Sequence, residues 1–129
     1  MSILFRMEYY VKDIEASLEF YENLVGLELY GRNERAARFN YDCFSLLLTS
    51  EQILNKKEKE RTYFDQNGMA QGKGNGAEMI IVVDRLEVVY ERFLHVDYPV
   101  VVGIQTYPWG MRGFKVADPD GNLIRITSE

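Results

Sequence analysis

The chain has 129 residues and a mass of 15.1 kDa, which is the size of one globular domain. Hydrophobic residues make up 47% and charged residues 27%, and this balance excludes an intrinsically disordered chain. No apolar run approaches the ~18 residues of a membrane span, so we expect no membrane partner. The N-terminus MSILFRMEYY has no basic segment followed by a long apolar one, so we expect no signal peptide. The single cysteine, Cys43, cannot form an internal disulfide, and a cytoplasmic protein is therefore expected.

The charge balance and the histidine count narrow the function classes further. The formal net charge is −5, which disfavours nucleic acid as a partner and mildly favours a cationic ligand. The one histidine, His95, excludes any metal site that needs two histidines from a single chain. Sites built from carboxylates and sites shared between subunits stay open.

A strand, a helix and three more strands are predicted in the first part of the chain. Alternating polar and apolar residues over 3–11 predict the opening strand. Asp13 is expected to cap the helix that follows, whose apolar residues recur at helical spacing until Gly26. Strands are then expected over 27–31, 35–41 and 44–49, with a turn at 41–43.

The same order of elements is predicted in the second part of the chain. A strand is expected over 78–83, and Asp84 is expected to cap a helix over 86–94. Three strands follow after Tyr98, and the last two are separated by the turn at 118–121. The sequence of that turn is Asp-Pro-Asp-Gly, in which proline suits the second position and glycine tolerates a positive φ.

The two parts therefore form an internal repeat. Their opening strands and helices match at an offset of 72 residues, from Arg6 to Glu78, and their closing turns match at an offset of 78, from Asp42 to Asp120. We predict an α+β fold in which two βαβββ modules form an open eight-stranded cup with the helices outside. The expected layout is a single domain over 1–129, with a first module (1–49), a long charged and glycine-rich linking loop (50–76) and a second module (77–129).

Strand alternation sorts the side chains between the two faces of each sheet. On the opening strand the more apolar face must meet the helix, which directs Arg6, Glu8 and Tyr10 into the cup. The repeat places Glu78 at the position of Arg6 in the second module. Arg125 is also expected inside the cup, because its two neighbours on the closing strand are isoleucines that belong on the helix side.

The sequence resembles the vicinal oxygen chelate superfamily, the group of glyoxalases, bleomycin resistance proteins and extradiol dioxygenases. The resemblance rests on VKDIEASLEFYENLVGLEL after the opening strand and on the closing FKVADPDGNLIRI. The run YPWGMRGFKVADPDGN is most similar to the bleomycin-resistance branch. The resemblance implies paired βαβββ modules and a homodimer, and in that branch it implies the binding of a cationic glycopeptide without chemistry.

Metal-dependent members of this superfamily carry one ligand on each opening strand and one on each closing strand. The resemblance places these positions at Arg6 and Glu78 and at Leu47 and Arg125. Only Glu78 can donate to a metal, because arginine stays protonated and leucine has no donor. We therefore expect no metal and no other cofactor, and hypothesise that Glu78 pairs with Arg6, with Arg125 or with both. Such a pair is either purely structural or leaves one arginine free for a ligand carboxylate or phosphate.

Together these observations predict a metal-free small-molecule-binding protein without catalytic residues. It would sequester an aromatic or cationic ligand in the cup or at a dimer interface. The tryptophan of the Pro-Trp-Gly turn either stacks on the ligand or anchors the core or the dimer. The predicted ligand-binding residues are Arg6, Glu8, Tyr10, Leu47, Glu78, Trp109, Phe114 and Arg125.

Two other functions stay open at this point. One is a metal-dependent lyase or dioxygenase of the same superfamily with non-standard carboxylate ligands, drawn from Glu8, Glu78 and aspartates, with His95 as a further candidate. The other is a regulatory or structural protein that binds no small molecule.

Overall fold

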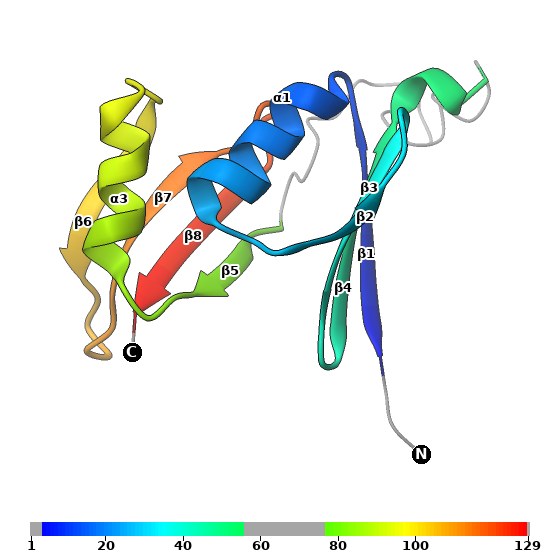
Figure 1. Ribbon diagram of the computed structural model, residues 1–129. Helices are drawn as coiled ribbons and strands as arrows, with labels where there is room; N and C mark the ends of the chain where they lie inside the picture. Colours follow the sequence, from blue (N-terminus) through cyan, green and yellow to red (C-terminus); the bar gives the residue numbers. More distant parts are fainter. Residues whose placement is uncertain (1–3, 56–76, 129) are drawn as a thin grey trace, which may run out of the picture. The chain divides into compact units, whose positions relative to one another are not determined.

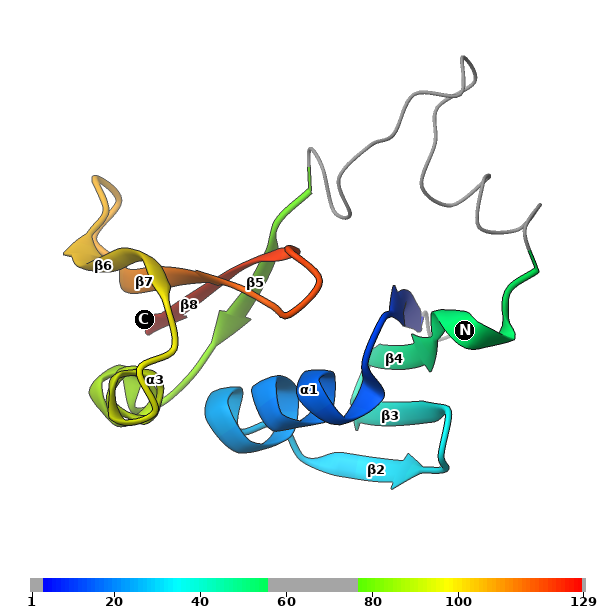
Figure 2. The same cartoon turned by 90° about the horizontal axis from the view of Figure 1, so that it is seen from above.

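The computed structural model of the chain describes residues 4–55 and 77–128, and it is drawn in Figures 1 and 2. Most of the predicted linking loop, residues 56–76, lies outside the described residues. The chain divides into two compact units, Met1–Gln71 and Gly72–Glu129, and each described part contains one four-stranded sheet with a helix on one face. No helix among the described residues is long and apolar enough to cross a membrane.

The first unit contains one sheet with the strand order β1-β4-β3-β2. Strand β1 runs parallel to β4, and the other neighbours are antiparallel. The helix α1 continues as a π-helical segment, η1, and a short 3₁₀ turn, η2, follows the last strand. The elements are β1 (Phe5–Val11), α1 (Ile14–Leu18), η1 (Glu19–Val25), β2 (Leu29–Arg32), β3 (Ala36–Tyr41), β4 (Phe44–Ser50) and η2 (Glu51–Ile53).

The second unit repeats this topology, with the order β5-β8-β7-β6 and β5 parallel to β8. Its elements are β5 (Met79–Val82), α3 (Leu86–His95), β6 (Val100–Thr106), β7 (Arg112–Ala117) and β8 (Leu123–Ser128). The predicted βαβββ order is thus confirmed in both halves, and neither sheet closes into a barrel.

One face of each sheet is buried under the helix of its own unit. In the first unit Phe20 and Tyr21 of η1 are fully buried, and the Tyr21 ring lies 6.4 Å from that of Phe39 on β3. In the second unit the fully buried ring of Phe93 on α3 lies 5.6 Å from Phe114 on β7. Each buried ring of this kind stabilises the fold by about 1.5–3 kcal/mol relative to an exposed one. The helices are therefore held by apolar packing on one face of each sheet.

We call the opposite face of each sheet the helix-free face. The alternation of side chains along the strands places residues on this face as predicted. On β4 the side chains of Leu46 and Leu48 are buried on the helix side, whereas Thr49 points the other way. The Thr49 hydroxyl donates to the Glu8 carboxylate on β1 at 2.8 Å, which places Glu8 on the helix-free face. In the second unit Ile124 and Ile126 are fully buried on the helix side, as predicted.

An exposed glutamate–arginine pair ties each helix to its own sheet. Glu15 in α1 binds Arg32 at the end of β2, and Glu87 in α3 binds Arg112 at the start of β7. The two glutamates are related by the same offset of 72 residues as the opening strands. The hydrogen bond from each arginine lowers the pKa of its glutamate. Arg112 consequently lies on the helix side of the second sheet.

The two helices begin differently. Asp13 caps α1 as predicted, and its Oδ1 accepts hydrogen bonds from the backbone N–H groups of Glu15 and Ala16 at 3.0 and 3.2 Å. The prediction that Asp84 caps α3 is wrong, because the N-cap residue is Arg85 and it makes no capping bond through its side chain. The repeat explains the error, since the offset of 72 residues places Arg85, not Asp84, at the position of Asp13.

The predicted turn between β7 and β8 is confirmed. Gly121 has a φ of 87°, and its N–H donates to the Asp118 carbonyl at 2.9 Å. The buried Asp118 carboxylate accepts from the N–H groups of Asp120 and Asn122 and from the Asn122 side chain. This network fixes the register with which β8 returns along β7.

We predict that Asp13→Ala lowers the free energy of unfolding by about 1 kcal/mol, because the first turn of α1 loses its cap. The matched control, Asp84→Ala, should change it by less than about 0.5 kcal/mol. Arg85→Asp should stabilise the protein by about 0.5–1 kcal/mol by supplying the missing cap. Urea denaturation of the three variants measures these differences, and equal losses for the two alanine variants would reject the capping role of Asp13.

Tyr98 makes stability depend on pH in the alkaline range. Its hydroxyl donates to the Ala117 carbonyl at 2.6 Å, and its ring packs at 5.5 Å against Phe93. Burial, and secondarily the charge of Asp118, raises the pKa of Tyr98 from 10.0 to about 12. A raised folded-state pKa contributes stability that is complete below the unfolded value and is lost as the pH rises through the folded value.

We therefore predict that the free energy of unfolding falls by about 1 kcal/mol between pH 10 and pH 12, allowing for solvent screening of this half-buried group. Tyr98→Phe should lose about 1 kcal/mol at neutral pH but show a flatter profile above pH 10. Tyr30→Phe is the control, since Tyr30 is 71% exposed. If Tyr98→Phe keeps the wild-type slope, Tyr98 is not the titrating group.

Candidate ligand-binding site

A cluster of three charged side chains lies on the helix-free face of the second sheet. Lys115 on β7 and Arg125 on β8 are register partners, so their side chains lie next to each other on one face. Glu78 precedes β5, and its Oε1 lies 2.9 Å from Arg125 Nε and 3.5 Å from Lys115 Nζ. The pairing of Glu78 with Arg125 was one of the predicted arrangements, whereas Lys115 was not foreseen.

The contact between Glu78 and Arg125 uses only part of each group. Arg125 Nε and Glu78 Oε1 are buried and close, yet their alignment does not make a hydrogen bond, so the contact is an ion pair. Arg125 Nη1 and Nη2 donate no hydrogen bond to any residue of the described ranges. One carboxylate thus faces two cations, and the planar fork of Arg125 remains available for an acceptor.

Two stacked aromatic rings lie beside this cluster. The rings of Tyr107 and Trp109 are nearly parallel, at 3°, with centroids 5.0 Å apart. Tyr107 is 8% exposed, whereas Trp109 is 61% exposed. The Arg125 guanidinium carbon lies 5.4 Å from the Tyr107 ring and 5.9 Å from the Trp109 ring, which is within the range of cation–π attraction.

The turn between β6 and β7 holds these rings in place. The Tyr107 N–H donates to the Met111 carbonyl at 2.7 Å, and the Gly110 N–H donates to the Tyr107 carbonyl at 2.9 Å. Gly110 has a φ of 97°, which side-chain-bearing residues rarely adopt. The Pro-Trp-Gly turn therefore presents Trp109 on a short, hydrogen-bonded loop whose base is the buried Tyr107.

Gly113 makes the room in which Tyr107 packs. A Cβ atom there would lie 2.7 Å from the Ile126 carbonyl oxygen, 2.8 Å from Thr127 Cγ2 and 3.2 Å from Tyr107 Cε2. Gly113 and Thr127 are register partners and share a face with Arg125. The Tyr107 and Thr127 hydroxyls are buried and have no hydrogen-bond partner among the described residues. Both hydroxyls are thus enclosed next to the site and are not accessible to a ligand in this structure.

The first unit presents a second polar surface on its own helix-free face. Glu8 accepts hydrogen bonds from Thr49 at 2.8 Å and from Tyr10 at 3.1 Å, so its carboxylate is held by two hydroxyls. Leu47 lies between Glu8 on β1 and Arg38 on β3 in the pairing register. Arg6 and Arg38 form no ion pair with any residue in the described part of the chain.

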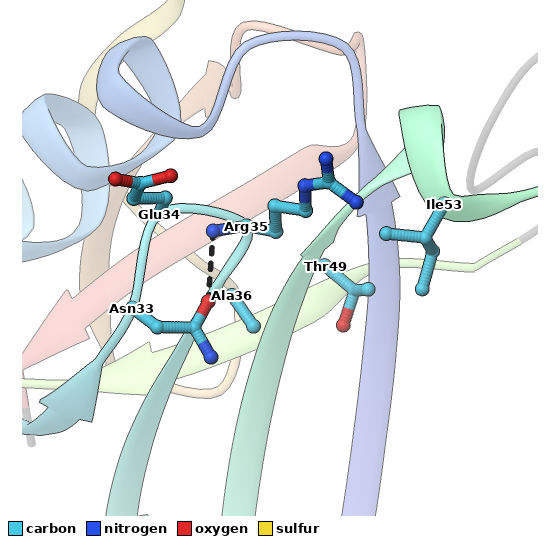
Figure 3. A pocket seen from close by; sticks show the side chains of 6 residues that line it. All are labelled: Asn33, Glu34, Arg35, Ala36, Thr49 and Ile53. Atoms are coloured by element: carbon cyan, nitrogen blue, oxygen red, sulfur yellow. Dashed lines mark hydrogen bonds between the residues drawn. The ribbon is translucent and has the colours of Figure 1, made fainter.

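Two hollows open on the first unit. One of about 490 Å³ lies at the end of the sheet, where the Arg35 side chain extends from the β2–β3 turn and Asn33 Oδ1 accepts from the Arg35 N–H at 2.8 Å (Figure 3). Its lining residues are Asn33, Glu34, Arg35, Ala36, Thr49 and Ile53. The other, of about 610 Å³, is lined in part by Arg6, Asn40 and Ser45. The sequence did not indicate the first hollow. One of its lining residues, Ile53, lies in the segment 50–76, which was predicted to be a linking loop.

The structure divides the predicted site residues between the two units. Arg6, Glu8, Tyr10 and Leu47 belong to the first helix-free face, and Glu78, Trp109 and Arg125 gather on the second. The prediction for Phe114 is wrong. Its ring is fully buried on the helix side, 4.8 Å from Tyr90 and 5.6 Å from Phe93, because β7 pairs Phe114 with the buried Ile126.

The four positions that the resemblance assigns to metal ligands do not suit a divalent cation. Arg6, Leu47 and Arg125 offer no lone pair, and the one carboxylate, Glu78, already faces Arg125 and Lys115. No group of three or more His, Cys, Asp or Glu side chains within 4–55 and 77–128 is placed to hold a metal ion. His95 ends α3, which lies on the opposite face of the sheet from Glu78.

A helix-backed βαβββ unit that occurs twice, with charged and aromatic residues on the helix-free sheet faces, is the architecture of the vicinal oxygen chelate class of proteins. The chain belongs to the glyoxalase/bleomycin resistance protein/dioxygenase superfamily, whose sequence profile matches residues 3–126. The predicted superfamily is thereby confirmed, while the bleomycin-resistance branch stays a prediction. A search of curated proteins returns no match.

Solved structures agree with this assignment. A lactoylglutathione lyase from Agrobacterium tumefaciens is 22% identical, with a TM-score of 0.66, and the match covers 99% of this chain and 94% of the other. A glyoxalase-related enzyme from Fulvimarina pelagi is 19% identical, with a TM-score of 0.74 and coverages of 100% and 89%. At these identities the similarity shows the fold, and function must be argued from the residues of the site.

We predict that Gly113→Ala destabilises the protein by about 1–3 kcal/mol, because the new methyl group meets backbone and displaces Tyr107. Gly31→Ala in β2 is the matched control, since a Cβ there has no atom within 4 Å. Thermal unfolding measures the stability, and near-ultraviolet circular dichroism reports the stack of Tyr107 on Trp109. Equal stability and equal spectra for the two variants would contradict the packing role of Gly113.

Proposed function

We propose that the chain binds a small aromatic molecule without a metal ion, and that the ligand stacks on Trp109. The observation that carries the proposal is the state of Trp109 itself. Its side chain is 61% exposed, yet its ring is held parallel to the buried Tyr107. A large, exposed and pre-positioned ring beside polar groups is typical of a binding site, because little conformational entropy is lost when a ligand stacks on it.

The polar neighbours of Trp109 suit binding without chemistry. Arg125 and Lys115 can orient a ligand, whereas neither activates a nucleophile in this arrangement. The proposal also includes a homodimer, which the resemblance implies, and a cytoplasmic location, which the single cysteine favours. Sequestration of the ligand, rather than its conversion, is the expected activity.

A metal-dependent lyase or dioxygenase is the second candidate. The similarity in fold to a lactoylglutathione lyase favours it. The donor set at Arg6, Leu47, Glu78 and Arg125 counts against it, since two guanidiniums would repel a divalent cation. The two candidates differ in what stabilises the folded protein, and this difference can be measured.

We expect aromatic ligands to raise the melting temperature of chelator-treated protein, and Ni²⁺, Zn²⁺, Mn²⁺, Fe²⁺ and Mg²⁺ to leave it unchanged. A ligand at 100 times its Kd stabilises the folded state by about 2.7 kcal/mol. The panel contains bleomycin-class drugs and simple naphthyl compounds. Trp109→Ala should abolish the shift, while Tyr30→Ala, which removes another exposed ring, should keep it. A rise in melting temperature with a metal alone would favour the metal-dependent enzyme. A rise with aromatic ligands that persists in Trp109→Ala would show that the ligand binds elsewhere.

A further inference from the structure

The charges on the helix-free faces differ in sign from the charge of the whole chain. The chain carries a formal charge of −5. Among the described residues of the second sheet, however, the helix-free face has two cations, Lys115 and Arg125, for one carboxylate, that of Glu78. The first sheet repeats this ratio on its own face, with Arg6 and Arg38 against Glu8. A bound ligand responds to the nearby charges more than to the distant ones, because salt screens charges beyond about 10 Å.

The contact geometry leaves positive charge unsatisfied beside Trp109. Glu78 Oε1 lies 2.9 Å from Arg125 Nε and 3.5 Å from Lys115 Nζ, so the same oxygen faces both cations. The two terminal amino groups of Arg125 have no hydrogen-bond partner within the described residues. Glu78 therefore lies at the Nε side of the guanidinium, and the Nη1–Nη2 edge, which can also bind a carboxylate in a bidentate manner, has no hydrogen-bond partner among the described residues.

We propose that the ligand of the second unit is a planar aromatic anion, with its ring on Trp109 and its carboxylate on the fork of Arg125. This inference rests on the proposed function and names the ligand class. The guanidinium lies 5.9 Å from the Trp109 ring, so one molecule the size of an aryl carboxylate can reach both groups. Lys115 adds a second cation on the same face, with Nζ 3.5 Å from Glu78 Oε1.

The same geometry disfavours the cationic ligand that the net charge suggests. A cation stacked on Trp109 would meet the guanidinium of Arg125, which already lies within cation–π range of both rings. It would also meet Lys115, and the one nearby carboxylate already faces both cations. We therefore expect the site to bind an anionic ligand more tightly than a cationic ligand of the same shape.

Three probes of matched shape test this inference: 2-naphthylacetate, 2-naphthylmethanol and 2-naphthylmethylammonium. They are titrated into ¹⁵N-labelled full-length protein at pH 7 and low salt. The chain contains a single tryptophan, so one indole N–H cross-peak reports on Trp109 without ambiguity. We expect all three to shift this peak, with the anion binding about tenfold or more tightly than the cation, and with the anion alone weakened by added NaCl.

Substitutions of Arg125 and Lys115 test whether these two cations cause the preference for the anionic probe. Arg125→Gln should weaken binding of the anion by about tenfold and leave the neutral probe unchanged. Lys115→Gln provides a second test that keeps both partners of the Glu78–Arg125 contact. Arg112→Gln is the control, because Arg112 lies on the helix side of the same strand and pairs with Glu87. It should bind all three probes like the wild type.

The outcomes separate the two proposals. Binding of the cation as tightly as the anion, with the indole peak shifted, would overturn the anion inference and leave the aromatic site standing. Anion selectivity that persists in both Arg125→Gln and Lys115→Gln would also overturn it. If none of the probes shifts the indole peak or shows heat in calorimetry, the proposed function fails together with the inference.

Discussion

The structure depends on one constraint, which is that each four-stranded sheet must bury one of its two faces. Alternation collects the apolar side chains on that face, and the helix of the same unit covers it with residues such as Phe20 and Phe93. The charged residues of the strands are thereby confined to the other face. Arg6 and Glu8 on β1 and Arg125 on β8 lie on the helix-free face for the same reason that Leu48 and Ile126 do not.

On the helix-free face of the second unit, a glycine and a tight turn position two stacked aromatic rings. Gly113 leaves space over β7, Tyr107 fills that space, and Trp109 rests on Tyr107 with most of its side chain exposed. Arg125 is held near both rings by Glu78. Because each of these contacts positions the next, the Trp109 ring and the Arg125 guanidinium are ordered in the chain without a ligand. Such order lowers the conformational entropy lost when the proposed ligand binds.

Within the superfamily, the same scaffold accommodates very different chemistry. The solved structures that resemble this chain include a lactoylglutathione lyase and a glyoxalase-related enzyme, yet the shared property is the fold. The resemblance assigns the family's ligand positions to Arg6, Leu47, Glu78 and Arg125, and in the second unit Glu78 forms an ion pair with Arg125. A guanidinium offers only N–H donors, and this chemistry is the reason why we propose an anionic ligand in place of a metal.

The sequence by itself determined the repeated βαβββ order, the cap at Asp13 and the faces of Glu8 and Arg125, because each follows from a local period or a short motif. Only the tertiary structure decided the surroundings of Trp109. An irregular turn separates β6 from β7, and alternation cannot be counted through it. The strand register therefore had to show that Phe114 pairs with the buried Ile126, and that Lys115 lies beside Arg125 on the helix-free face. Contacts between residues far apart in the chain depend on that register, which no local pattern encodes.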